Sequence, residues 1–204
     1  MNETIAYYNS HAEEFCESTV NANMSDVRNR FLKYLPLGSR ILDAGCGSGR
    51  DSLAFLEAGY EVDSFDAAES ICEKAGLLLK RDVPCMTFTD VNRIGEYSGI
   101  WACASLLHLP KEDLPETLKI LNRSLVKNGI LYCSFKYGTV ERETAGRFFT
   151  DLTCEELSAL ISKSGYDVLE IFKTEDVREN RTGQVWVNCI ARKHYCDPSS
   201  EQSA

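Results

Sequence analysis

The feature that most constrains this 204-residue chain is a glycine-rich turn that joins a short apolar run to an amphipathic segment. Ile41 and Leu42 precede the sequence Asp-Ala-Gly-Cys-Gly-Ser-Gly-Arg at 43–50, and apolar residues then recur at helical spacing from Leu53. A buried strand, a tight turn and a helix in this order form the first half of a βαβ unit. Glycine allows a ligand to approach bare backbone, and the first amides of the helix point at that ligand. The sequence therefore predicts a ligand site at residues 43–50.

Two acidic residues near the turn indicate the kind of ligand. A second strand over 60–65 ends at Asp66, about 20 residues past the turn, where nucleotide-binding βαβ units contact ribose hydroxyls. The glycines follow G-x-G-x-G rather than G-x-G-x-x-G, and Asp43 directly precedes them. A carboxylate there repels a pyrophosphate and attracts a cation. S-adenosylmethionine, which has a sulfonium, an ammonium, a ribose and an adenine but no phosphate, fits better than NAD, so a nicotinamide oxidoreductase is disfavoured.

These residues carry a family resemblance. The segment 42–49, Asp66 and the later pair Thr89-Asp90 resemble the first three motifs of class I S-adenosylmethionine-dependent methyltransferases. Within that class, 46–53 and 58–66 most closely resemble the small tellurite-resistance-type branch. The resemblance is specific for the fold and the cofactor and does not specify the methyl acceptor.

The resemblance extends over about 7–193 and implies an α/β, Rossmann-like methyltransferase fold. Its sheet would be seven-stranded and mostly parallel, with a C-terminal antiparallel hairpin and helices on both faces. Residues 1–193 would form one domain, with 1–36 as a helical segment covering the site, and 194–204 is expected to be a disordered tail. Later strands are predicted at 83–88, 99–103, 130–135, 167–173 and 185–191, and helices at 24–35, 67–80, 111–126 and from the capping box Thr153/Glu156 to Gly165. Asn128-Gly129 is interpreted as a helix stop, and 136–147 as a polar loop.

The resemblance also implies which residues bind S-adenosylmethionine and its product S-adenosylhomocysteine. Tyr8 would lie at the edge of the N-terminal segment, Asp90 would accept from the adenine amino group, and the Val91 amide would meet a ring nitrogen. The alternatives are that Tyr7 and Tyr8 only pack on the flank of the domain and that Asp90 occupies a surface turn. The predicted cofactor-binding residues are Tyr8, Asp43, Gly45, Cys46, Gly47, Gly49, Arg50, Asp66, Ala67, Asp90, Val91, Cys103 and Ala104.

The acceptor is expected over the ends of the fourth and fifth predicted strands. If the acceptor is a hydroxyl or an ammonium, a base is needed. His108 is the candidate catalytic residue because its ordinary pKa suits that task, and the alternative is a structural role. Tyr137 and Arg147 are the candidate substrate residues. Lysine and arginine in the loop 136–147 suggest an anionic group on the substrate, and solvated loop charges are the alternative.

Composition narrows the function classes. The 22 Lys+Arg against 31 Asp+Glu give a net charge of −9, so nucleic acid is an unlikely substrate. There is no apolar run long enough to span a membrane. None of the nine cysteines forms a C-x-x-C pair, which favours free thiols in a reducing compartment and hence a cytoplasmic protein. Three scattered histidines match no zinc motif, so no metal is expected.

The sequence thus predicts methyl transfer from S-adenosylmethionine to a small-molecule acceptor. An RNA or protein methyltransferase and a non-catalytic S-adenosylmethionine-binding module are the alternatives. After the fourth predicted strand the chain has Ala104-Ser-Leu-Leu rather than an Asn-Pro-Pro-Tyr-type motif, which disfavours methylation of an amide or of adenine in nucleic acid. The acceptor and the oligomeric state are not determined by the sequence.

Overall fold

The computed structural model describes residues 2–178, 181 and 183–194. The expected disordered tail therefore lies outside the described residues, apart from His194. The helices are α1 (Asn2–Ser10), α2 (Ala12–Val20), α3 (Ser25–Leu32), α4 (Arg50–Glu57), α5 (Glu69–Leu79), α6 (Leu114–Ser124) and α7 (Cys154–Lys163), with short 3-10 turns η1 (Phe88–Asp90) and η2 (Leu106–His108). The strands are β1 (Arg40–Ala44), β2 (Glu61–Phe65), β3 (Tyr97–Ala102), β4 (Leu125–Lys136), β5 (Glu141–Thr144), β6 (Arg147–Thr150), β7 (Tyr166–Glu175) and β8 (Val185–Lys193).

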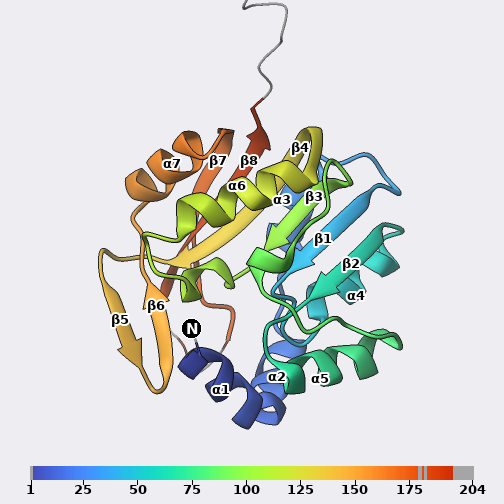
Figure 1. Cartoon of the computed structure of the whole chain (residues 1–204), viewed down its shortest axis with the longest axis vertical. Coiled ribbons are helices and arrows are strands. Elements are labelled where there is room, and N and C mark those ends of the chain that lie inside the picture. The colour runs from blue at the N-terminus through green and yellow to red at the C-terminus, as the bar shows by residue number, and fades with distance from the viewer. Residues whose placement is uncertain (1, 179–180, 182, 195–204) are drawn as a thin grey trace, which may run out of the picture.

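The main sheet has the strand order β2-β1-β3-β4-β8-β7 (Figure 1). The first four strands are parallel, and β8 pairs antiparallel with both β4 and β7. This arrangement confirms the predicted Rossmann-like α/β class and its C-terminal antiparallel hairpin. The carboxyl ends of β1, β2 and β3 meet at one edge, where open α/β sheets bind their ligands.

Apolar side chains on alternate positions of the central strands fill two cores, one on each face of the sheet. Ile100 and Leu131 belong to the core under α6 and α7, whereas Trp101 and Tyr132 point to the opposite face, toward α3 and α4. Figure 1 shows α6 and α7 in front of the sheet and α3 behind it. The Trp101 and Tyr132 rings stack with centroids 3.9 Å apart and are fully buried. The alternation follows from the two-residue period of a strand.

The predicted strand over 83–88 is wrong, so the main sheet has six strands among the described residues rather than seven. The segment makes one isolated bridge, between Cys85 and Asp66. Pro84 lacks a backbone N–H and cannot continue a hydrogen-bonded ladder, and both Pro84 and Cys85 are exposed. The chain then enters the short turn η1.

Two further expectations need correction after α6. The helix ends at Ser124, four residues before Asn128, and β4 begins at once. Asn128, with φ 61°, lies in the irregular first part of that strand and does not end the helix. The expected polar loop 136–147 instead contributes to a two-stranded hairpin of β5 and β6. The β5 strand, Glu-Arg-Glu-Thr, is mostly exposed, whereas the last two residues of β6, Phe149 and Thr150, are buried.

Candidate active site

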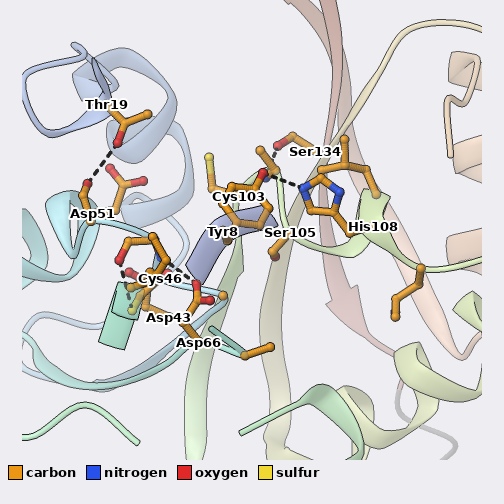
Figure 2. A pocket seen from close by; sticks show the side chains of 18 of the residues that line it. Tyr8, Thr19, Asp43, Cys46, Asp51, Asp66, Cys103, Ser105, His108 and Ser134 are labelled. Carbon is orange, nitrogen blue, oxygen red and sulfur yellow. Dashed lines mark hydrogen bonds between the residues drawn. The ribbon is translucent and has the colours of Figure 1, made fainter. Parts of the chain in front are cut away.

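A cavity of about 620 Å³ lies at the carboxyl ends of β1, β2 and β3 and extends beneath the N-terminal helices (Figure 2). It brings together most of the site residues that the sequence predicts. Those that line it are Tyr8, Asp43, Gly45, Cys46, Gly47, Arg50, Asp66, Ala67, Cys103, Ala104, His108 and Arg147. Four predicted residues do not line it: Gly49, Asp90, Val91 and Tyr137.

The glycine turn forms the floor of this cavity in the way its sequence predicts. Gly45 has φ +83°, and a Cβ added there would lie 2.5 Å from the Cβ of Ser105, which no side chain tolerates. The amides of Gly45 and Cys46 both donate to the carbonyl of Phe65, at 3.0 and 2.9 Å, and so fix the turn to the end of β2. Gly49, also left-handed at φ +79°, is the N-cap of α4, and its role is therefore to shape the turn.

Asp66, at the end of β2, is held in a defined orientation by backbone amides. Its two carboxylate oxygens accept from Gly47 N at 3.0 Å and from Ala68 N at 3.1 Å. Burial raises the pKa of Asp66, and these amide hydrogen bonds oppose that rise. Each carboxylate oxygen has a second lone pair, so Asp66 can also accept from a ligand in the cavity.

Asp43, at the end of β1, lies deeper than Asp66. It is buried, it accepts from Ser52 Oγ at 2.6 Å, and burial together with the charge of Asp51 raises its pKa to about 7. Figure 2 shows Asp43, Cys46 and Asp66 gathered on one side of the cavity. The Cys46 thiol is buried, and its burial raises its pKa well above the ordinary value. A neutral buried thiol does not act as a nucleophile.

Asp51 anchors this side of the cavity, and sequence reasoning missed it. Its carboxylate accepts from Arg50 at 2.6 Å, from Arg28 at 2.7 Å and from the Trp101 indole at 3.0 Å. Burial favours the neutral acid, but the charge of Arg50 and the arginine hydrogen bonds outweigh it, so the pKa of Asp51 is lowered. The adjacent Arg50-Asp51 pair is visible in the sequence, but nothing there shows that two distant residues, Arg28 and Trp101, also bind the same carboxylate.

Helices α1 and α2 cover the cavity from the N-terminal side. Figure 1 shows them beside α5, at the edge of the sheet where the cavity lies. Asn9 accepts from Ser70 N at 3.0 Å, and Thr4 accepts from Phe148 N at 2.9 Å. These side-chain contacts fasten α1 to the start of α5 and to the β6 strand, so α1 bridges the two sides of the opening.

Tyr8 of α1 contacts His108 directly. The Tyr8 hydroxyl lies 3.0 Å from His108 Nε2, while His108 Nδ1 lies 2.7 Å from the carbonyl of Phe148 (Figure 2). A carbonyl only accepts, so Nδ1 carries the proton and donates, and Nε2 accepts from the tyrosine hydroxyl. Burial, with the charges of Arg147 and Lys136, lowers the pKa of His108 to about 4 despite the Phe148 hydrogen bond.

This pKa contradicts the premise that made His108 a candidate base, namely an ordinary pKa. At neutral pH the imidazole is neutral, its one free lone pair is occupied by Tyr8, and its conjugate acid is strong. The geometry shows His108 in direct contact with Tyr8 of α1, and its role in catalysis stays a prediction.

Asp90, which is expected to contact adenine, does not line the cavity. The Asp90 carboxylate accepts from Thr87 N at 2.7 Å and from Thr87 Oγ1 at 2.8 Å, forming a capping box for η1. These hydrogen bonds from Thr87 lower the pKa of Asp90. The preceding residues Met86, Thr87, Phe88 and Thr89 line the cavity in its place.

On the acceptor side, Arg147 lines the cavity and Tyr137 does not. The Tyr137 ring is 42% exposed, and Lys173 Nζ lies 3.5 Å from its centroid. Among the described residues no group of three or more His, Cys, Asp or Glu could hold a metal ion. No helix among those residues has the length and apolar composition to cross a membrane.

Comparison with known proteins decides the family. Residues 16–201 match the family described as "Methyltransferase domain". The chain belongs to this family. The match covers most of the chain, and it confirms the methyltransferase class that the residues 42–49 and Asp66 predict.

The similarity to individual relatives is lower or covers only part of the chain. The chain is 33% identical over 117 residues to the putative methyltransferase YqeM of Bacillus subtilis, covering 52% of this chain and 47% of that protein. It thus spans about half the length of that curated relative. In fold it resembles 1,6-didemethyltoxoflavin-N1-methyltransferase of Burkholderia thailandensis, whose structure was solved with S-adenosylhomocysteine bound. The TM-score is 0.78 at 20% identity, and the match covers 95% of this chain and 87% of that one. An S-adenosylmethionine-dependent methyltransferase of Methanosarcina mazei gives a TM-score of 0.73 at 16% identity, with coverage of 85% and 99%.

Proposed function

We propose that this methyltransferase domain transfers a methyl group from S-adenosylmethionine to a small molecule. The observation that carries the proposal is the single cavity in which the glycine turn, Asp66 and the Tyr8–His108 pair converge. The family supplies the cofactor class, and two features of the cavity fit it. Gly45 lets the turn lie directly against Ser105, where any Cβ would clash, and Asp66 presents a fixed carboxylate of the kind that binds ribose hydroxyls.

When bound, S-adenosylmethionine supplies an electrophilic methyl group on a sulfonium, which is already a good leaving group. The protein's task is then to position the acceptor and to exclude water. In our proposal Asp66 holds the ribose, the floor of Gly45 and Gly47 receives the remainder of the cofactor, and residues 86–89 replace Asp90 as the adenine contact. Tyr8 and His108 keep α1 closed over the acceptor. A histidine with a pKa of about 4 is a weak base, so the proposal favours an acceptor that needs little or no proton removal.

A small acceptor is favoured over RNA or protein for two physical reasons. Contacts from α1 to both Phe148 and Ser70 narrow the opening that a large polymer would have to enter. A net charge of −9 also repels a polyanion.

The test combines cofactor binding with a transfer assay. We expect calorimetry to show binding of S-adenosylmethionine and S-adenosylhomocysteine but not of NAD, and Asp66→Asn to weaken that binding by about 10-fold, since a hydrogen bond to a charged acceptor is lost. Labelled S-adenosylmethionine is then incubated with a cell extract, which is fractionated by size. Label in the small-molecule fraction supports the proposal. Label in RNA or protein supports the polymer alternative, and binding without any transfer supports a binding module.

A further inference from the structure

The cavity differs in charge between its two sides. The cofactor side carries the carboxylates of Asp43, Asp51 and Asp66, whereas the opposite side, formed by the end of β4 and the start of β6, carries Lys136 and Arg147. A basic patch is unexpected in a chain with a net charge of −9. The contacts of Lys136 and Arg147 show whether other side chains neutralise these two charges.

Lys136, the last residue of β4, is partly buried beside an aromatic ring. Its ammonium nitrogen lies 4.3 Å from the centroid of the Phe149 ring. Burial lowers the pKa of Lys136, and the charges of Arg142, Arg181 and Arg147 lower it further, while Asp151 opposes them. Among the described residues no carboxylate lies within ion-pair distance of Lys136.

Arg147, the first residue of β6, is held between aromatic rings. Its guanidinium lies 4.3 Å from the Tyr7 centroid, 5.3 Å from that of Phe149 and 5.9 Å from that of Tyr8. Its Nε is buried and makes no hydrogen bond. In the part of the chain that the structure describes, Arg147 likewise has no carboxylate partner.

Two neighbouring arginines have carboxylate partners. Arg142 forms an ion pair with Asp151, and Arg178, which also lines the cavity, forms one with Asp176 at 2.6 Å. The Phe149 ring contacts Arg142 as well as Lys136 and Arg147, so it is the carboxylate partner that distinguishes Arg142 from the other two. A partly buried cation without a counter-ion is costly, and a buried guanidinium N–H without an acceptor adds to that cost.

We propose that the methyl acceptor carries a carboxylate group, which binds between Lys136 and Arg147. The inference rests on the proposed function, because it names the class of molecule that the transfer acts on. A planar carboxylate matches the fork of a guanidinium and can accept from an ammonium at the same time. The side chains around the two cations, Tyr7, Tyr8 and Phe149, are aromatic, so an acceptor with an apolar body beside its carboxylate fits best.

A phosphate ester fits this side less well. Phosphate sites in proteins commonly use a helix N-terminus or a glycine-rich turn, whose backbone amides supply several donors. Here the two cations lie at the end of one strand and the start of another, and Lys136 and Arg147 supply the donors. The carboxylate of the cofactor itself could also occupy the space between Lys136 and Arg147. The experiments below distinguish a carboxylate on the acceptor from a phosphate ester and from the cofactor carboxylate.

The experiment uses the full chain and a small-molecule cell extract. The extract is separated on an anion exchanger above about pH 11, where amines are neutral, so that amino acids are also retained through their carboxylates. Each pool is incubated with labelled S-adenosylmethionine, before and after treatment with a phosphatase. Because thiols and phenols are also anionic at this pH, part of the retained pool is treated to convert its carboxylates to esters. We expect label in the retained pool, unchanged by the phosphatase and abolished by the esterification. Label in the unretained pool, label abolished by the phosphatase, or label that survives esterification would overturn the carboxylate inference and leave the proposed methyl transfer intact. Absence of label in every pool would overturn the proposed function and the inference with it.

Variants then test the two cations against the labelled pool. Lys136→Gln and Arg147→Gln should each lower the transfer rate at limiting acceptor by about 10- to 100-fold, as expected for loss of a charge-assisted hydrogen bond. Arg147→Lys keeps the charge but loses the forked guanidinium, so its transfer rate should lie between those of the wild type and Arg147→Gln. Lys163→Gln, at an exposed position, is the matched control. S-adenosylhomocysteine affinity, measured by calorimetry, should stay the same in all four. If S-adenosylhomocysteine affinity fell as much as the transfer rate, the two cations would bind the cofactor. If the transfer rates were unchanged, the cations would bind neither the acceptor nor the cofactor. Either result overturns the inference.

Discussion

Protonation of His108 should couple the stability of this protein to pH. The pKa of His108 is lowered from 6.5 to about 4 in the folded protein, first by burial and then by the charges of Arg147 and Lys136. The unfolded chain therefore binds a proton below pH 6.5 that the folded chain binds only near pH 4. The free energy of unfolding must fall as the pH drops through this window, and it levels off below pH 4.

The size of the effect follows from the two pKa values. Linkage gives a loss of about 0.8 kcal/mol at pH 6 and about 2 kcal/mol at pH 5, relative to pH 8, where the histidine is neutral in both states. Other groups also titrate in this range, such as Asp43 with its pKa raised to about 7. The comparison of wild type with His108→Gln at each pH removes their contribution, because glutamine keeps an amide donor and an acceptor but does not titrate.

The assay is urea unfolding of the two proteins at pH 8, 7, 6 and 5. The wild-type curve should lose about 2 kcal/mol more than the His108→Gln curve between pH 8 and pH 5. His11→Gln, at an exposed position in the loop between α1 and α2, controls for the removal of an imidazole as such. Parallel curves for wild type and His108→Gln would refute the reasoning, because they would mean that His108 has the same pKa in both states.

Three other substitutions follow from the site geometry. Asp51→Asn should destabilise the protein by about 3 kcal/mol in urea unfolding, because two partly buried arginines lose their buried counter-ion. Gly45→Ala should abolish S-adenosylhomocysteine binding in calorimetry, because the added Cβ would lie 2.5 Å from the Cβ of Ser105. Gly59→Ala is the control: Gly59 also has a positive φ, but a Cβ there would meet nothing within 4 Å, so binding should stay intact. Asp90→Asn should leave that affinity largely unchanged, and a loss of about 10-fold, or about 1.4 kcal/mol, would restore Asp90 as an adenine contact.

The cofactor side of the site could be predicted from the sequence because its determinants are local. The turn at 43–50 needs glycine at positions with positive φ, and the next strand delivers Asp66 to the same edge of the sheet. Both are consequences of strand and turn geometry over a single βαβ unit. Strands at 99–103, 130–135 and 185–191 could also be located, because these apolar runs have the lengths of buried strands.

Other features depend on tertiary contacts that no local pattern records. The apolar residues of 83–88 are typical of a strand, yet Pro84 prevents a ladder and the segment turns into η1. His108 follows a strand in the sequence, but its pKa depends on burial, on a hydrogen bond to the Phe148 carbonyl and on cations from β4 and β6. Asp51 gains its role from Arg28 and Trp101, which are 23 and 50 residues away.

The basic side of the cavity shows why an average over the sequence misleads about the acceptor. A net charge of −9 argues against polyanions, because it describes the field far from the surface. At contact distance the field comes from the nearest unpaired charges, and the β5–β6 hairpin places Arg147 against Phe149 beside Lys136. Arg142 and Arg178 lie in the same region but are neutralised by Asp151 and Asp176. In our proposal the presence or absence of a carboxylate partner, rather than the number of cations, gives this acidic protein a site that attracts a carboxylate.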